Sequence, residues 1–354
     1  MKQYFLIALM LFRTGANAQS LIDKDIQRIT SGALAEEISY CPENAVRYAG
    51  AVVMEVSTGN VVANVSFIYK DGEIVKNSAG NTVSVPTGLG RSVLYLAMMP
   101  KANPYMLVDT KDGLYVDSEG YSIEDHNHHR GGYGMLDMKR SFDYNSNIGM
   151  LKCAERKFKK DIKMFAEAIN MTGILFGSKA TTGYGATWHS RDILGFTSPM
   201  SLLQQVCWIN AVAGGKFVIR LDEKDSSEPY DEILNHEGLD SLRLAMLECV
   251  NQGLGIRMRS EHISVGAITN TSPRDAEGDK GLFAAGFFPY ENPEYSFAVY
   301  IQKDWKKGYA SPSSVARKII DWMTYNKLKE PPYLSFESSS TIKHKDGWIH
   351  PSER

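Results

Sequence analysis

Apolar residues near the start of the chain recur with the spacing of an amphipathic helix. In residues 21–38 the apolar positions that share one helical face are Leu21, Ile22, Ile26, Ile29, Leu34 and Ile38. The pattern then changes, because residues 51–56 and 61–67 are rich in β-branched side chains and flank a short segment that contains Gly59. We therefore expect a helix followed by a β-hairpin.

A second group of strand-like segments lies late in the chain. These segments are separated by short polar loops and span residues 263–270, 281–288 and 295–302. A closing helix is expected from Pro312, with Val315, Ile319, Ile320 and Met323 on one face. Residues 86–261 are expected to be mainly helix and loop. Early and late strands should therefore meet in one mostly antiparallel sheet with a large helical insertion, which is an α+β fold.

The N-terminus has the pattern of a secretory signal peptide. Lys2 precedes an apolar stretch at residues 4–12, and Ala16-Asn17-Ala18 follows as a small-residue cleavage site. The apolar stretch is too short to cross a bilayer as a helix. We therefore expect a signal peptide at residues 1–18, an exported periplasmic body at 19–328 without a membrane span, and a polar tail at 329–354.

Composition narrows the classes of function. The chain has 354 residues and a formal net charge of −2, which gives no electrostatic basis for binding nucleic acid. The basic run at residues 156–163 is interpreted as a solvated helix face. No phosphate-binding or dinucleotide-binding glycine pattern is present, and no cofactor is expected. The four cysteines are too widely spaced to favour one disulfide pairing or a metal finger, and they are Cys41, Cys153, Cys207 and Cys249.

Several stretches, taken in order, resemble the transpeptidase domain of penicillin-binding proteins. They include "LIDKDIQRITSGAL", "AGAVVMEVSTGNVVANVS", "GYGMLDMKRSFDYNSNIGMLKCAE", "ILGFTSPMSLLQQVCWINAVAGGKFV", "SLRLAMLECVNQGLG" and "AGFFPYENPEYSFAVYI". The resemblance covers nearly all of residues 21–326. It implies a β-lactamase/transpeptidase-like α+β fold, with a mostly antiparallel sheet flanked by helices.

The chemistry of that family depends on three motifs, S-x-x-K, S-x-N and K-T-G. In the stretch "VPTGLGRSVLYLAMM" the resemblance places Gly88 at the serine and Arg91 at the lysine. In "NSN" it places Asn145 at the serine and keeps Asn147. In "AITNTS" the Lys-Thr-Gly positions correspond to Ile268, Thr269 and Asn270.

These replacements remove the family's chemistry. Gly88 carries no nucleophile, and an arginine at position 91 keeps its proton, so it cannot act as a base. Ile268 removes the positive charge of the third motif. Peptide binding is expected to survive through the backbone N–H groups of Gly88 and Thr271, which the resemblance places at the oxyanion hole. Arg91 is left with two readings, an anion ligand or a structural ion pair.

Other chemistry-bearing residues are weaker candidates. Ser92 lies near the nucleophile position but has no lysine three residues later, and we expect its hydroxyl to be satisfied locally. The sequence at 340–343 spells S-x-x-K in the polar tail and is interpreted as chance. The segment "EDHNHHR" offers candidate metal ligands in Asp125, His126, His128 and His129, but its flanking glycines indicate an exposed loop, and no metal is expected.

The leading hypothesis is a catalytically inactive, exported relative that binds or scaffolds at the peptidoglycan cell wall. Its partners would be peptidoglycan peptides or envelope proteins, with no nucleic acid and no membrane. One alternative is an active D,D-transpeptidase or penicillin-binding acyl-serine enzyme with an unrecognised nucleophile. Another is an envelope protein–protein interaction module.

Overall fold

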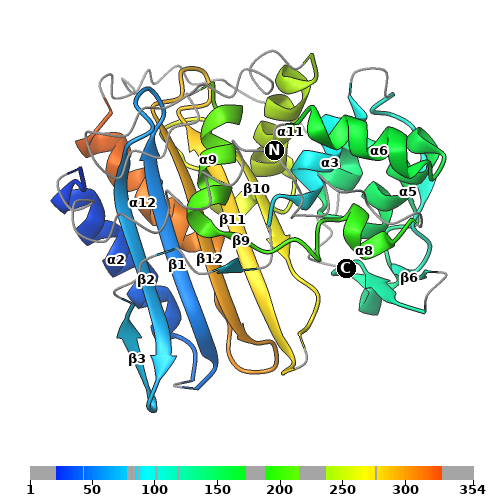
Figure 1. Ribbon diagram of the computed structural model, residues 1–354. Helices are drawn as coiled ribbons and strands as arrows, with labels where there is room; N and C mark the ends of the chain where they lie inside the picture. The colour runs from blue at the N-terminus through cyan, green and yellow to red at the C-terminus, as the bar shows by residue number, and fades with distance from the viewer. Residues whose placement is uncertain are drawn as a thin grey trace, which may run out of the picture.

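A six-stranded antiparallel sheet brings the early and late strands together (Figure 1). The computed structural model describes residues 21–42, 44–77, 81, 84–85, 88–99, 103–117, 120–172, 188–214, 237–275 and 277–328. The expected signal peptide, the polar tail and the S-x-x-K at 340–343 lie outside these residues. The strands, in the order in which they lie side by side, are β10 (Gly266–Thr271), β11 (Asp279–Phe288), β12 (Tyr295–Asp304), β1 (Val46–Glu55), β2 (Val61–Lys70) and β3 (Glu73–Lys76).

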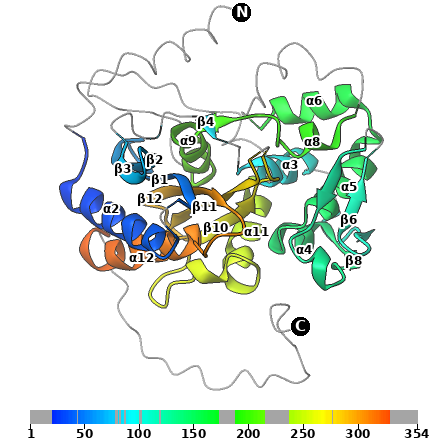
Figure 2. The same ribbon diagram turned by 90° about the horizontal axis from the view of Figure 1, so that it is seen from below.

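Both faces of the sheet are covered, which explains why its strands read as nearly continuous apolar runs. Helices α2 (Lys24–Ser39) and α12 (Pro312–Asn326) lie against one face, and α9 (Leu202–Val212) lies against the other (Figure 2). Successive residues of β1 point to opposite faces. Val53 accordingly packs in the core under α12, whereas Val52 packs in the core that includes Trp208 of α9.

The predicted architecture is confirmed, although several strand boundaries differ from those expected. Strand β1 pairs with β12, and Val53 lies opposite Phe297. Residues about 240 positions apart in the sequence are therefore neighbours in the sheet. The strand expected from residue 263 begins only at Gly266, because the carbonyl of Ser264 accepts a hydrogen bond from the N–H of Tyr290 in the loop after β11. The short edge strand β3 was not foreseen.

The insertion forms a helical lobe beside the edge strand β10. Its helices are α3 (Gly90–Met98), α4 (Met138–Asp143), α5 (Asn147–Phe158), α6 (Ile162–Asn170) and α8 (Ser190–Ile193), and α11 (Leu239–Gln252) packs on β10. Short turns of 3-10 helix occur at η2 (His128–Arg130) and η3 (Ile256–Met258).

The lobe also contains short strand pairs that the sequence did not reveal. They are β4 (Ser84–Val85) with β9 (Met200–Ser201), β5 (Val108–Asp109) with β8 (Met135–Leu136), and β6 (Leu114–Val116) with β7 (Ser122–Glu124). Ladders of two or three residues are too short to show a period of two, so hydrophobic periodicity could not have found them.

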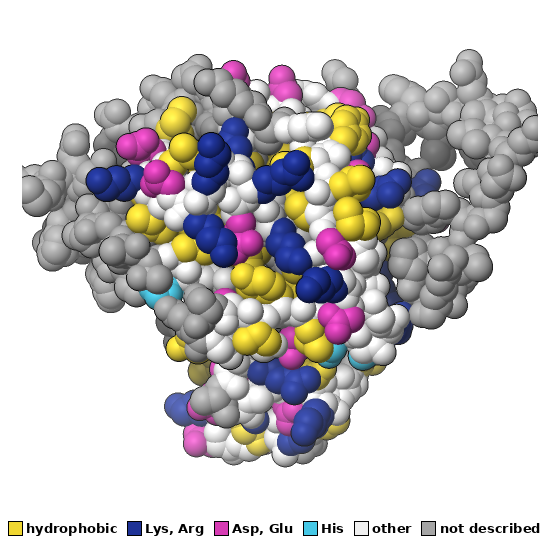
Figure 3. Space-filling model, turned by 90° about the vertical axis from the view of Figure 1, so that its right-hand side faces the viewer, with side chains coloured by type: hydrophobic (Ala, Val, Ile, Leu, Met, Phe, Trp, Pro, Cys, Tyr) yellow, Lys and Arg dark blue, Asp and Glu magenta, His cyan; other side chains and the backbone are white. Residues whose placement is uncertain are grey.

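The outer face of the lobe is polar and of mixed charge. Figure 3 shows Lys and Arg side chains interspersed there with Asp and Glu and with single apolar groups. Arg156 and Lys163 of the basic run are exposed, and Lys160 forms an ion pair with Glu155 at 3.2 Å. These contacts fit a solvated face.

Two further observations concern the whole described chain. No helix in the described ranges is long and apolar enough to cross a membrane. All four cysteines are free thiols, and three of them, Cys153, Cys207 and Cys249, are buried.

Candidate functional site

Gly88 lies just before α3 in a position that leaves no room for a side chain. A Cβ built on Gly88 would overlap the ring of Phe283, which projects from β11. The N–H of Gly88 donates to Oε1 of Gln205 at 2.7 Å, and its carbonyl accepts from Nδ2 of Asn270 at 3.2 Å. The expectation that this N–H remains available to a ligand was therefore wrong, because a buried glutamine side chain already accepts its hydrogen bond.

Arg91 in the first turn of α3 joins three elements of the fold. Its side chain is buried, with the residue only 5% exposed. Nη1 donates to Oδ1 of Asn147 at 2.5 Å, and Nη2 donates to the carbonyl of Thr269 at 3.0 Å. Asn147 begins α5 and passes the chain of contacts on, since its Nδ2 donates to the carbonyl of Glu124 at 2.9 Å. Arg91 thus links α3, α5 and β10.

The charge of Arg91 persists in this buried setting. Burial lowers the pKa of Arg91 to about 10, and the Asp125 carboxylate opposes that change. At neutral pH the guanidinium therefore stays protonated and acts only as a donor. Of the two readings left open by the sequence, hydrogen bonding within the fold is the one observed, although its partners are an amide and a peptide carbonyl rather than a carboxylate.

The contact between Arg91 and Thr269 closes part of a sheet edge. Strand β10 is at the edge of the sheet, so one side of it has no neighbouring strand. Free N–H and C=O groups on an edge strand are a template for an extended peptide. The carbonyl of Thr269 on that side is already taken by Arg91.

The residues that the alignment assigns to the three motifs converge around a very small cavity. Its volume is about 10 Å³, which is at the lower limit for one water molecule. Gly88, Arg91, Asn145, Ile268 and Thr269 line it together with Ser92, Phe142 and Cys249. Asn270 is buried against Gly88. The site between these residues is filled by their own side chains.

Ser92 differs from the sequence expectation. Its hydroxyl is buried and has no hydrogen-bond partner among the described residues, so it is not satisfied locally. Every residue of α3 from Gly90 to Met98 is buried, so Ser92 lies within the core. A hydroxyl with no contacting base is a poor nucleophile.

Asp125, in the loop between β7 and η2, contacts the start of α5. Its buried carboxylate accepts hydrogen bonds from Oγ of Ser146 at 2.6 Å and from the N–H of Ile148 at 3.1 Å. Burial raises the pKa of Asp125, and these hydrogen bonds partly offset that effect. Ser146 is also the N-cap of α5, since its Oγ accepts from the N–H of Gly149 at 2.9 Å, and sequence reasoning missed this signal.

Asn145 occupies the left-handed region with φ of 59°. Asparagine is among the few residues that adopt this conformation readily. The turn directs the chain from α4 into α5 and places Asn145 at the small cavity and Asn147 beside Arg91.

Each of the three histidines of this segment has its own contact. Nδ1 of His126 lies 3.0 Å from the hydroxyl of Tyr133, and Nδ1 of His128 lies 3.1 Å from the carbonyl of Asp125. His129 meets His128 edge to face. In the part of the chain that the structure describes, no group of three or more His, Cys, Asp or Glu side chains is placed to hold a metal ion.

A much larger groove begins immediately outside the small cavity. It has a volume of about 1070 Å³ and lies between β7, η2 and the ends of β10 and α11. Asn145, Asn147 and Thr271 line its inner end. Some of the residues at the motif positions therefore line the small closed cavity, and others line the inner end of the open groove.

The sheet, the lobe and this arrangement of residues define a class of protein, and comparison with known families agrees. The sequence model of the penicillin binding protein transpeptidase domain matches residues 49–321. Since this is most of the chain, the protein belongs to that family. A search of curated protein sequences found no significant match.

Two solved structures illustrate the likeness in fold. Penicillin binding protein 3 from Mycobacterium tuberculosis, complexed with aztreonam, is 16% identical with a TM-score of 0.65, and the match covers 88% of this chain and 80% of that one. The transpeptidase domain of the FtsI4 D,D-transpeptidase from Legionella pneumophila is 14% identical with a TM-score of 0.59, covering 85% and 97%. At these sequence identities the two comparisons show a shared fold and nothing more specific.

Proposed function

We propose that this protein is an exported, catalytically inactive member of the transpeptidase family that acts by binding or scaffolding at the cell wall. The observation that carries the proposal is the double hydrogen bond of Arg91 to Asn147 and to the carbonyl of Thr269. The alignment places a catalytic lysine at this position in the family. The buried guanidinium stays protonated, and its N–H groups hold the fold together. It therefore cannot accept a proton from a nucleophile.

Acyl transfer also needs a nucleophile and space for the substrate carbonyl. Gly88 offers no hydroxyl, and its N–H is already hydrogen-bonded to Gln205. A cavity of about 10 Å³ accommodates no peptide. Each of these features independently supports the loss of acyl-transfer chemistry, so the proposal does not depend on the exact alignment of one motif.

Covalent labelling with a fluorescent penicillin tests the loss of catalysis. We expect intact-mass spectrometry of the folded chain to show no adduct, whereas an active penicillin-binding protein treated in parallel becomes labelled. The Gly88→Ser variant is the matched control for a simply missing nucleophile. It should also remain unlabelled, because its Cβ overlaps Phe283 and Arg91 supplies no base.

A penicillin adduct on a serine of the unmodified chain would favour the alternative, an active transpeptidase or acyl-serine enzyme with a nucleophile elsewhere. Labelling of Gly88→Ser alone would show that the rest of the machinery is intact. Either result would contradict the proposal.

Location and binding are tested together by fractionating cells that express the full chain. We expect the protein in the periplasmic fraction, with an N-terminus near Gln19, because the first 18 residues have the pattern of a cleaved signal peptide. Purified peptidoglycan sacculi should then sediment it. An uncleaved cytoplasmic chain would contradict export. A periplasmic chain that ignores sacculi would favour the envelope protein–protein interaction module.

A further inference from the structure

The open groove beside the closed site is lined by positive charge. Five cationic side chains among its described residues define what we call the basic groove: Arg130, Arg191, Arg257, Arg274 and Lys280. None of the five forms an ion pair with another described residue. The chain as a whole has a net charge of −2, so this concentration is local.

Few carboxylates face the basic groove. Glu124 is its exposed acid, and Asp125 is buried and hydrogen-bonded to Ser146. An unpaired cluster of like charges costs free energy that a bound anion would recover. Arg274 and Lys280 illustrate this cost, since burial lowers the pKa of Lys280 and the charge of Arg274 lowers it further.

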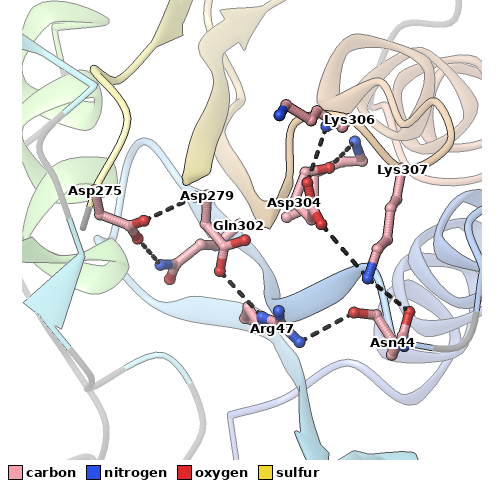
Figure 4. A network of polar contacts seen from close by, with 9 residues as sticks. Asn44, Arg47, Asp275, Asp279, Gln302, Asp304, Lys306 and Lys307 are labelled. Carbon is pink, nitrogen blue, oxygen red and sulfur yellow. Dashed lines mark hydrogen bonds and ion pairs between the residues drawn. The ribbon is translucent and has the colours of Figure 1, made fainter. Parts of the chain in front are cut away.

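The acids adjacent in sequence to Arg274 and Lys280 have other partners. Figure 4 shows Asp275 and Asp279 in a polar network at the lower end of the sheet. Oδ2 of Asp279 lies 3.0 Å from Nε of Arg47, and Oδ2 of Asp275 accepts from Nε2 of Gln302 at 3.1 Å. Neither Asp275 nor Asp279 is therefore paired with Arg274 or Lys280, and Glu124 is the exposed acid on the described groove wall that acts on Lys280.

A further acid, Asp304, is used in the same network. Its side chain accepts from the N–H of Lys306 at 3.0 Å and pairs with Nζ of Lys307 at 3.5 Å (Figure 4). Its sequence neighbour Trp305 instead lines the basic groove and is 43% exposed. The network thus separates the acids from the cationic wall.

Aromatic rings hold three of the cations in place. Nζ of Lys280 lies 4.5 Å from the ring centre of Trp305, and the guanidinium carbon of Arg257 lies 5.1 Å from that of Tyr309. The guanidinium of Arg191 lies 5.3 Å from the ring of Tyr121. Such contacts orient a cation without neutralising it. The heads remain available to an anion while losing little conformational freedom on binding.

We infer that the basic groove binds an acidic segment of a polypeptide. Guanidinium groups recognise carboxylates with two parallel hydrogen bonds. The cations come from η2, α8, η3, β11 and the loop between β10 and β11, so several segments of the groove wall contribute one. A ligand with several carboxylates on a flexible chain can reach cations that are held by separate segments. One face of each of three aromatic rings is covered by a cation, which disfavours an acidic glycan that would stack on open ring faces.

This inference does not rest on the loss of catalysis. The groove lies outside the small cavity, and its five cations do not line that cavity. Penicillin labelling of the protein would overturn the proposed function and leave the basic groove untouched.

Fluorescence anisotropy with a labelled hexaglutamate peptide and the full chain provides the test. We expect binding at low ionic strength that weakens as salt is added, because screening reduces attraction between exposed charges. The double variant Arg257→Gln/Arg274→Gln should raise the Kd at least tenfold. The matched control is Arg140→Gln/Arg259→Gln, which removes the same charge from exposed arginines outside the groove and should change the Kd less than twofold.

Several results would overturn the inference. They are no binding of hexaglutamate at low salt, an equal loss in both double variants, or tighter binding of a galacturonate hexamer or of inorganic polyphosphate. A hexaglutamine peptide should not bind. Thermal unfolding of each variant checks the fold, and Lys280→Gln gives a second groove variant should Arg257→Gln disturb the contact with Tyr309.

Discussion

Arg91 shows how the chemistry of one side chain changes what a position can do. A lysine presents a compact ammonium that can lose its proton when buried, whereas a guanidinium is a planar fork of donors that keeps its charge. In this fold the fork reaches an amide oxygen on α5 and a carbonyl on β10 at once. Arg91 therefore acts as a cross-link between elements. Its charge can be buried because these two N–H donors are hydrogen-bonded.

The cross-link predicts a loss of stability when the fork is removed. Arg91→Lys retains the charge but cannot reach Asn147 and Thr269 together, so one acceptor is left unpaired. We expect the free energy of unfolding to fall by about 1.5–3 kcal/mol, the typical value of a hydrogen bond to a charged group. Urea denaturation followed by circular dichroism measures it.

Arg140→Lys, at an exposed position of α4, is the matched control and should change the stability by no more than about 0.5 kcal/mol. Equal stability of Arg91→Lys and the unmodified chain would show that the cross-link does not hold the lobe to the sheet.

Helices α4 and α11 meet at a cluster of charges in which Asp143 is buried and Lys139 and Glu248 are partly exposed. Nζ of Lys139 lies 3.3 Å from Oδ2 of Asp143 and 2.5 Å from Oε2 of Glu248. The backbones of the two helix ends also lie close together, because a Cβ on Gly253 would overlap the carbonyl of Asp143. That carbonyl accepts a hydrogen bond from the N–H of Leu254 at 2.9 Å. One lysine thus serves two carboxylates, and Oδ1 of Asp143 has no partner among the described residues.

This junction predicts that stability depends on pH. Burial raises the pKa of Asp143 to about 7 despite the opposing charge of Lys139, while the unfolded value is near 3.8. The folded state therefore binds more protons than the unfolded state between these values. The stabilisation is fully present below about pH 4 and is lost as the pH rises through about 7.

Asp143→Asn removes this titration and keeps the shape of the side chain. Urea denaturation at pH 5 and pH 7 should show a smaller fall in stability for the variant than for the unmodified chain. Asp240→Asn, at an exposed position of α11, is the control and should leave the fall unchanged. The same pH dependence in the unmodified chain and Asp143→Asn would refute the assignment, since Glu248 and Tyr95 also face the cluster.

At the scale of the molecule, the family fold depends on its apolar cores. Both faces of the sheet are buried by helices, and this burial depends on apolar side chains rather than on the motif positions. The likeness to solved transpeptidases at 14% and 16% identity is consistent with that division. A scaffold held by its two cores can change the residues at one edge of the sheet without losing its architecture.

The sequence alone determined the first and last helices, the long strands and their order, because hydrophobic periodicity and capping signals are local, but it did not reveal β3 or the short strand pairs of the lobe. It also determined that Gly88 carries no nucleophile and that Arg91 is no base, since these are properties of the side chains themselves. Tertiary structure decided what those residues do instead. The contact of Arg91 with Thr269 spans residues 178 positions apart, and the overlap of a Gly88 side chain with Phe283 depends on the packing of β11. The basic groove is likewise assembled from distant segments, so only the folded chain brings its charges together.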